Sequence, residues 1–146
     1  MKLTGKIIGD RYRVDEYLGS NGITQDYRVV WDEQRQADFI MRVLPEKLAT
    51  DKVFLRRFHR EALRLAKLQH PNIMQFYGLE QDERLAFMLT EYFEGESLKL
   101  KIFDAQTPFS PQQIQEILHP TINALQYLHK QGVVHGNVAP ANIIWT

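Results

Sequence analysis

The chain has 146 residues, of which 44% are hydrophobic and 25% charged, a composition typical of one globular domain and unlike that of disordered or fibrous proteins. Its 18 basic and 18 acidic residues balance, so no net charge draws it toward nucleic acid or an anionic membrane. The absence of cysteine excludes disulfides, thiolate catalysis and cysteine-ligated zinc, and it is compatible with the cytoplasm, where we expect the protein to reside. We predict no signal peptide and no membrane span within this segment.

Three short segments rich in β-branched and aromatic residues come first in the chain, at 12–18, 26–31 and 38–44. Glycine and asparagine in the first connection are typical of turns, so we predict an antiparallel meander. Pro45 should end the third strand, because proline cannot donate to a strand ladder.

Residues 51–69 then show the spacing of an amphipathic helix, with Asp51 as its expected N-cap. Two more strands are predicted at 73–77 and 85–90, joined by the polar turn "EQDER". The sequence therefore predicts five strands, with one long helix between the third and the fourth.

A second long helix is predicted after a linker and a short segment at 97–103. Ser110 can cap its start, Pro111 suits the first helical position and Gln113 can complete a capping box. Gly132 is the expected stop.

Five segments occur in the order and rough spacing of the protein kinase family: "YLGSNGITQDYRVV", "FIMRVLP", "HREALRLAKLQHPNI", "LTEYFEGESL" and "HGNVAPANII". From about residue 12 to residue 146 the chain resembles the family's bacterial serine/threonine branch. The resemblance implies an α+β fold with a five-stranded antiparallel small lobe and one long helix at 12–90, a hinge at 91–96, and the first helices of a large lobe at 97–146. Residues 1–11 are expected to form an N-terminal extension. The match ends just after the catalytic loop, so we expect the large lobe to be incomplete and the chain to be truncated before the magnesium-binding Asp-Phe-Gly motif.

The family's glycine-rich loop falls on Gly19, Asn21, Thr24 and Asp26, which keeps one glycine of three and replaces a valine with a carboxylate. Glycine matters there because the backbone must approach phosphate oxygens closely. The family valine packs against adenine, so an anion at Asp26 faces both desolvation and the triphosphate. An ordinary hairpin turn is the alternative interpretation of this segment.

The family's strand lysine is replaced by Arg42, whereas its helix partner Glu61 is retained. A planar guanidinium does not reproduce a compact ammonium aimed at the phosphates, so we expect Arg42 and Glu61 to form a structural ion pair. At the hinge, Thr90 stands at the gatekeeper position, and the Glu91 carbonyl and Phe93 amide would meet adenine. A linker between lobes is the alternative interpretation.

ATP and Mg²⁺ are the cofactors that the resemblance implies, and we expect their binding here to be weak or absent. The implied cofactor-contacting positions are Leu18, Gly19, Gly22, Ile40, Arg42, Glu61, Thr90, Glu91, Phe93 and Asn142.

In the catalytic loop, Asn137 replaces the catalytic aspartate, and a neutral amide cannot accept the proton of a substrate hydroxyl. Loss of such a base typically costs about 10²–10⁴ in rate. Ala139 replaces the lysine that neutralises the γ-phosphate. Asn142 remains as a candidate metal ligand, and His135 matches a position that is structural in the family, so we interpret it as a core residue.

Two surfaces are candidates for a protein partner or for self-association: the apolar face of the helix at 111–130, and a basic stripe on the first long helix. The stripe comprises Lys52, Arg56, Arg60, Arg64 and Lys67. A solvated helix face is the default interpretation of the stripe. No aromatic residues interleave it, so we do not expect nucleic-acid binding.

The leading hypothesis is a kinase-like domain without catalytic activity, a pseudokinase with a protein-binding or regulatory role. One alternative is a serine/threonine protein kinase that transfers the γ-phosphate of ATP to protein hydroxyls. Another is a truncated gene product without function. Whether the chain is an enzyme therefore stays open from its sequence.

Overall fold

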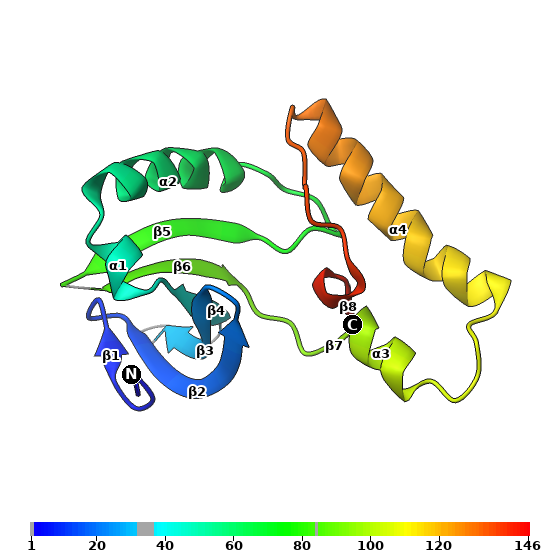
Figure 1. Ribbon diagram of the computed structural model, residues 1–146, viewed down its shortest axis with the longest axis horizontal. Helices are drawn as coiled ribbons and strands as arrows, with labels where there is room; N and C mark the ends of the chain where they lie inside the picture. Colours follow the sequence, from blue (N-terminus) through cyan, green and yellow to red (C-terminus); the bar gives the residue numbers. More distant parts are fainter. Residues whose placement is uncertain (1, 32–36, 84) are drawn as a thin grey trace. The chain divides into compact units, whose positions relative to one another are not determined.

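The computed structural model describes residues 2–31, 37–83 and 85–146 (Figure 1). These residues form two compact units. The sheet unit comprises Met1–Gln69 and Met74–Tyr92, and the helical unit comprises His70–Ile73 and Phe93–Thr146. Each is described by itself below.

The sheet unit is built on a six-stranded antiparallel sheet with the order β1-β2-β3-β4-β6-β5. Its strands are β1 (Ile7–Ile8), β2 (Tyr12–Asn21), β3 (Thr24–Trp31), β4 (Asp38–Val43), β5 (Phe76–Asp82) and β6 (Leu85–Glu91). The predicted meander is present, but β2 and β3 extend further into the glycine-containing segment than expected. Asn21 pairs with Thr24, which leaves Gly22 and Ile23 as a two-residue turn. Gly22 has a φ of 70° at the first turn position, the requirement of a type II′ hairpin.

Residues 2–11 contribute to the sheet unit, which the sequence did not indicate. Strand β1 pairs with β2 through Ile7 and Ile8, and Leu3 and Ile8 are buried in the core at 3% and 5% exposure. The Gly9 amide donates to Asp82 Oδ2 at 2.8 Å, which ties this segment to the far end of β5. A strand of two residues has no periodicity to detect, so it is defined by its partner.

The strand β5 begins and ends later than the predicted 73–77. Residues 78–82 have low strand propensity, but all of them pair with β6, so the partner strand overrides local preference. A register shift between Phe76 and Gly78 marks a bulge, and Gly78 has a φ of 128° there.

Two hydrophobic cores cover the two faces of the sheet. One face carries Tyr27, Val29 and Met41, which pack with Leu3 and Ile8. On the other face the helix α2 (Lys52–Leu65) packs, as Figure 1 shows above β5. The second core consists of Leu44, Leu55, Ala62, Leu79 and Ala86, with Phe54, Phe58, Phe76 and Met88 against them.

The ends of α2 have clear local causes. Asp51 is its N-cap, as predicted, because its Oδ1 accepts from the Phe54 amide at 3.0 Å. The helix ends at Leu65, four residues before the predicted limit, with Ala66 as C-cap. A short helix, α1 (Glu46–Ala49), follows Pro45 and was not predicted.

The helical unit contains β7 (Glu96–Ser97), α3 (Leu98–Asp104), α4 (Pro111–Lys130), the 3-10 turn η1 (Pro140–Asn142) and β8 (Ile144–Trp145). The predicted capping box is present: the Gln113 amide donates to Ser110 Oγ at 3.2 Å, and the Ser110 amide donates to Gln113 Oε1 at 2.8 Å. Gly132, with a φ of 73°, follows the C-cap residue of α4, as predicted.

The apolar face predicted on the second long helix is divided. Ile117, Ala124 and Leu128 of α4 are buried, while Ile114 and Leu118 are exposed. None of the helices in the described ranges is long and apolar enough to cross a membrane.

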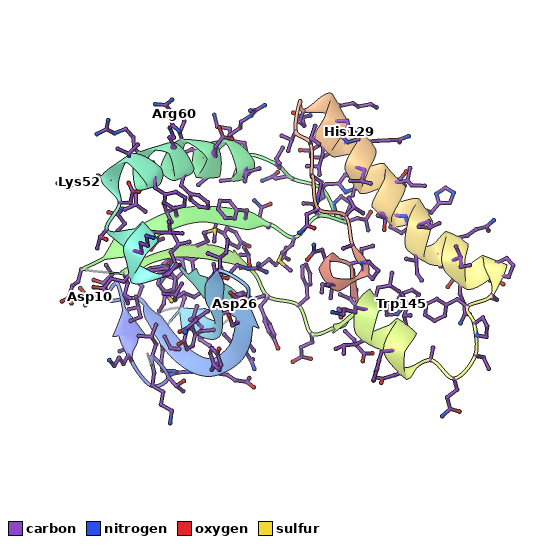
Figure 2. The ribbon with its side chains drawn as sticks, in the orientation of Figure 1. Asp10, Asp26, Lys52, Arg60, His129 and Trp145 are labelled. Atoms are coloured by element: carbon purple, nitrogen blue, oxygen red, sulfur yellow. The ribbon has the colours of Figure 1, made fainter. Side chains whose placement is uncertain are left out.

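The strands β7 and β8 hold the last residues of the chain. Glu96 pairs with Trp145 and Ser97 with Ile144, and the Leu98 amide donates to the Ile143 carbonyl at 2.8 Å. A Cβ atom on Gly95 would lie 2.6 Å from the carbonyl oxygen of Trp145, so only glycine fits at this close approach. Trp145, labelled in Figure 2, also lies beneath the Lys101 ammonium, which is 5.1 Å from its ring centre.

Candidate functional site

Strand pairing brings several of the predicted nucleotide-contacting residues of the sheet unit onto one face. Asp26 of β3 lies opposite Arg42 of β4, and Ile40 of β4 lies opposite Thr90 of β6. Residues directly opposite each other in antiparallel strands share a face, and alternate residues share it too. The next residue along β4, Met41, points into the core on the other face.

Three of the residues that depart from the family pattern contact one another. Thr24 Oγ1 donates to Asp26 Oδ1 at 2.8 Å, and Asp26 Oδ2 lies 3.9 Å from Arg42 Nε. Thr24 is 7% exposed, and the side chains of Asp26 and Arg42 are 13% and 28% exposed. The Asp26 carboxylate is labelled in Figure 2. A hydroxyl, a carboxylate and a guanidinium therefore form one continuous polar group where the family has glycine, valine and lysine.

The prediction of an ion pair between Arg42 and Glu61 is wrong. Within the described residues, the charged partner of Arg42 is Asp26, and Glu61 lies on an exposed position of α2. The reason is register: the cross-strand pairing of β3 and β4 places a carboxylate directly opposite the guanidinium. A directly opposed partner needs less side-chain ordering than one on a separate helix.

A second ion pair lies on the same face and was missed from the sequence. Arg28 of β3, opposite Ile40, donates from Nε to Asp38 Oδ2 at 3.0 Å and also contacts that carboxylate through Nη2. Its guanidinium carbon lies 4.9 Å from the ring centre of Tyr92, at the end of the sheet unit. The hydrogen bond with Asp38 raises the pKa of Arg28 above its ordinary value. The only signal in the sequence is a pair of opposite charges on two successive strands.

The residues at the end of β6 that would face adenine have polar contacts of their own. The Glu91 carboxylate accepts from the Gln75 amide at 3.1 Å, and the Glu91 amide donates to the Gln75 carbonyl at 2.9 Å. Thr90 is buried, and its Oγ1 has no hydrogen-bond partner within the described chain. Phe93 is half-buried and begins the next part of the helical unit. Among the described residues, Thr90 Oγ1 shares the lack of a hydrogen-bond partner with Arg42 Nε and Trp31 Nε1.

The glycine-rich segment is a hairpin. Leu18 is exposed, Gly19 has a φ of 126° beside a register shift in β2, and Gly22 forms the turn. Thr24 and Asp26 are regular strand residues. Thr24 does not adopt a left-handed backbone conformation, so a β-branched residue is accommodated at this position without backbone strain.

The catalytic-loop segment is exposed and held by backbone contacts. The Asn137 amide donates to His135 Nδ1 at 3.1 Å, and Asn142 Nδ2 donates to the Asn137 carbonyl at 2.9 Å. His135 is exposed, which corrects its assignment as a core residue. Gly136 has a φ of 77°, so the tight path of the loop favours glycine at this position.

The structure leaves the ligating atom of the predicted metal ligand outside the loop's hydrogen bonds. Asn142 donates from Nδ2 to the Asn137 carbonyl, and Oδ1, the atom through which asparagine binds a metal ion, is not used in that bond. In the ranges that the structure describes, no group of three or more histidine, aspartate or glutamate side chains could hold a metal ion.

The basic stripe of α2 is exposed along its length. Lys52, Arg56, Arg60 and Arg64 follow each other at four-residue intervals, and all are solvent-exposed. Figure 2 labels Arg60 on the side of the helix away from the sheet and Lys52 at its N-terminal end. The first turn of the helix contains no acidic residue. The stripe therefore has positive charge at the end of the helix where the macrodipole favours negative charge.

The comparisons with known proteins agree with this architecture. The sequence profile described as "Protein kinase domain" matches residues 12–146. The chain is 31% identical over 142 residues to the serine/threonine-protein kinase PrkC of Bacillus subtilis, covering 97% of this chain and 22% of that protein. It is 34% identical over 141 residues to PknB of Mycobacterium leprae, covering 94% of this chain and again 22% of the relative.

Solved structures are similar along the whole chain. The kinase domain of PknI from Mycobacterium tuberculosis superposes with a TM-score of 0.82 at 26% sequence identity, covering 100% of this chain and 58% of that domain. This confirms the predicted α+β fold, with a small lobe and the start of a large lobe. The chain belongs to the protein kinase family, among its bacterial serine/threonine members.

Proposed function

We propose that this chain is a catalytically inactive kinase-like domain that acts by binding another protein. The observation that supports this most directly is the Thr24, Asp26 and Arg42 group, in which the cation at the position of the phosphate-binding lysine faces a carboxylate of the same sheet. The chain spans only 22% of the length of its curated relatives, so their activities are not carried over to it.

The loop chemistry supports the same proposal. Phosphoryl transfer relies on positioning and charge neutralisation, with a carboxylate to accept the proton of the substrate hydroxyl. Asn137 supplies an amide, which has no basic oxygen at neutral pH, and its backbone is occupied by His135 and Asn142. Ala139 adds no positive charge. In this chain, the cation at the phosphate-binding position is therefore paired with a carboxylate, and the loop has an amide where the catalytic base would be.

The test is incubation with ATP, Mg²⁺ and a generic protein substrate, with a bacterial relative such as PrkC as positive control. We expect no phosphate transfer, and no change when Asn137 is replaced by alanine. Turnover that Asn137→Ala abolishes would refute the proposal, because it would assign the chemistry to that side chain.

A second candidate is a weak serine/threonine kinase, favoured by the cation that remains at Arg42 and by the family asparagine retained at Asn142. Thermal shift with ATP, with and without Mg²⁺, discriminates between the two. A ligand that binds the native state raises stability by mass action, about 2.7 kcal/mol at a concentration of 100 Kd. A large shift that requires Mg²⁺ would favour the kinase.

The protein-binding part of the proposal rests on the basic stripe. Like charges four residues apart destabilise a helix by about 0.2–0.5 kcal/mol per pair. Lys52, Arg56, Arg60 and Arg64 make three such pairs in a row. The apolar face of α2 is used in the second core, through Leu55 and Ala62, so it does not serve for membrane insertion. An acidic protein segment is the partner that offsets this cost.

A synthetic helical peptide with glutamate at four-residue intervals is the probe. Arg56→Glu with Arg60→Glu should abolish its binding, whereas Lys2→Glu with Lys6→Glu, an equal charge change on exposed residues outside the stripe, should not. Equal loss in both variants would show that net charge, and not this face, governs the binding.

A further inference from the structure

We infer that Asp26 is the residue that keeps phosphate groups off this domain: its carboxylate is an internal anion that already occupies the Arg42 cation. The inference rests on the proposed function and adds a cause to it. The exclusion of nucleotide is assigned to one side chain, not to the loss of the lysine or of the glycines.

The Asp26 carboxylate is fixed from two directions. Thr24 Oγ1 holds Oδ1 at 2.8 Å from within β3, and the register of β3 with β4 directs Oδ2 toward Arg42. Thr24 is buried, so its hydroxyl has little freedom to turn toward solvent. Asp26 therefore neutralises the charge of Arg42 while its backbone keeps the regular pairing of β3.

Arg42 still has unused capacity to bind an anion. Its Nε lies 3.9 Å from Asp26 Oδ2, which is longer than a hydrogen bond, and this buried nitrogen has no hydrogen-bond partner in the described part of the chain. A guanidinium offers five N–H donors in a planar fork that suits phosphate oxygens. The pair is therefore electrostatic, and it leaves the Nε donor of Arg42 without a hydrogen bond among the described residues.

Charge decides whether an anion approaches. With Asp26 ionised, a phosphate near Arg42 meets an ion pair without net charge, and contact with a carboxylate of the same sign disfavours association. Replacing the carboxylate by its amide leaves the shape and the Thr24 contact in place and returns one net positive charge to the site. Binding of phosphate groups should then appear without any change at Arg42, Asn21 or Thr24.

The experiment compares the native chain with Asp26→Asn and Asp26→Val, by calorimetry with tripolyphosphate and separately with ATP. Tripolyphosphate tests the binding of phosphate groups to Arg42 alone, whereas ATP also tests contacts with the adenine ring. We expect both variants to bind tripolyphosphate about tenfold or more tightly than the native chain. The double variant Asp26→Asn with Arg42→Gln should lose that gain, because the cation is then absent.

The matched control is Asp15→Asn, which removes the carboxylate of another ion pair of the sheet, Arg13 Nε to Asp15 Oδ1 at 2.9 Å. It should leave tripolyphosphate affinity unchanged. Folded Asp26→Asn protein that binds no more tightly than the native chain, or no better than Asp15→Asn, would overturn the inference. Circular dichroism and the melting temperature establish folding, and Asp26→Val provides a second test if one variant is unstable.

The proposed function and this inference fail in different ways. Phosphate transfer by the native chain would refute inactivity. Absence of binding in both Asp26 variants would refute only the role of Asp26. We expect Asp26→Asn to bind ATP and to transfer no phosphate, since Asn137 is unchanged.

Discussion

The face formed by β3 and β4 and the loop at 135–142 both depart from the kinase pattern, but in different ways. On the sheet, Thr24, Asp26 and Arg42 contact one another and are mostly shielded from solvent. In the loop, Asn137 is exposed and contacts its neighbours through its backbone. Substitutions on the sheet depend on each other, whereas those in the loop are independent. Single changes should therefore have large effects on the first region and small effects on the second.

The largest loss of stability is expected from a change beside the strand pair β7 and β8, which follows the loop at 135–142, and not from a change within that loop. Gly95→Ala places a Cβ atom 2.6 Å from the Trp145 carbonyl oxygen and 2.9 Å from Ile144 Cγ2, so β7 and β8 must separate. Overpacking of this kind costs up to about 3 kcal/mol. Denaturant unfolding followed by Trp145 fluorescence in a Trp31→Phe background measures it, since the chain has two tryptophans.

The neighbouring exposed residue provides the control for this prediction. Glu94→Ala should stay within about 0.5 kcal/mol of the parent. Equal free energies of unfolding for Gly95→Ala and Glu94→Ala would show that β7 and β8 accommodate the added Cβ atom without loss of stability.

Alkaline pH should weaken the sheet unit next most strongly. Burial, and then the hydrogen bond from Tyr12 Oη to Glu80 Oε1 at 3.0 Å, raise the pKa of Tyr12 from 10.0 to about 12. The contribution of Tyr12 to stability is complete below pH 10 and is lost as pH rises toward about 12. The free energy of unfolding should fall by roughly 2–3 kcal/mol over that range.

Tyr12→Phe provides the comparison for this pH dependence. Unfolding followed by Trp31, whose ring centre is 6.4 Å from that of Tyr12, should show a flatter profile in the variant. Some slope should remain, because burial also raises the pKa of Tyr27. An identical slope in the variant and the parent would assign the pH dependence to other groups.

A matched pair of deletions compares the two regions directly. Thr24→Val keeps the side-chain shape and removes the hydroxyl that donates to Asp26, which should cost about 1.5–3 kcal/mol because the acceptor is charged. Asn142→Ala removes the exposed bond to the Asn137 carbonyl and should cost less than about 0.5 kcal/mol. Urea midpoints at equal slope provide both values. Similar costs for the two would contradict the contrast drawn above.

The smallest effect on stability is expected for Asn137→Asp. The residue is exposed, so the free energy of unfolding should change by less than about 0.5 kcal/mol. Phosphate transfer should stay absent, because Arg42 is still paired with Asp26. Transfer restored by this single change would show that the sheet does not limit activity.

Much of the fold could be predicted because its signals are local. The Asp51 cap, the capping box at Ser110 and Gln113, and the stop at Gly132 depend on residues within a few positions of one another. Strands β1, β7 and β8 could not be predicted, since each has two residues and is defined by a distant partner.

The candidate site shows the same division. The identity of Arg42 and Asn137 is visible in the sequence, but the contact between Asp26 and Arg42 depends on strand register. The contact of Arg28 with Tyr92 depends on where the chain goes after β6, which no local pattern specifies.

The packing of residues 2–11 bears on how the domain should be delimited. The family match begins at residue 12, yet Leu3 and Ile8 are core residues, and Gly9 is hydrogen-bonded to Asp82. A shortened protein that starts at Tyr12 would expose the surface these two side chains cover, at about 1.5–3 kcal/mol each. The family match thus begins later in the chain than the hydrophobic core does. A fragment that starts at Tyr12 should aggregate under conditions in which the longer chain does not.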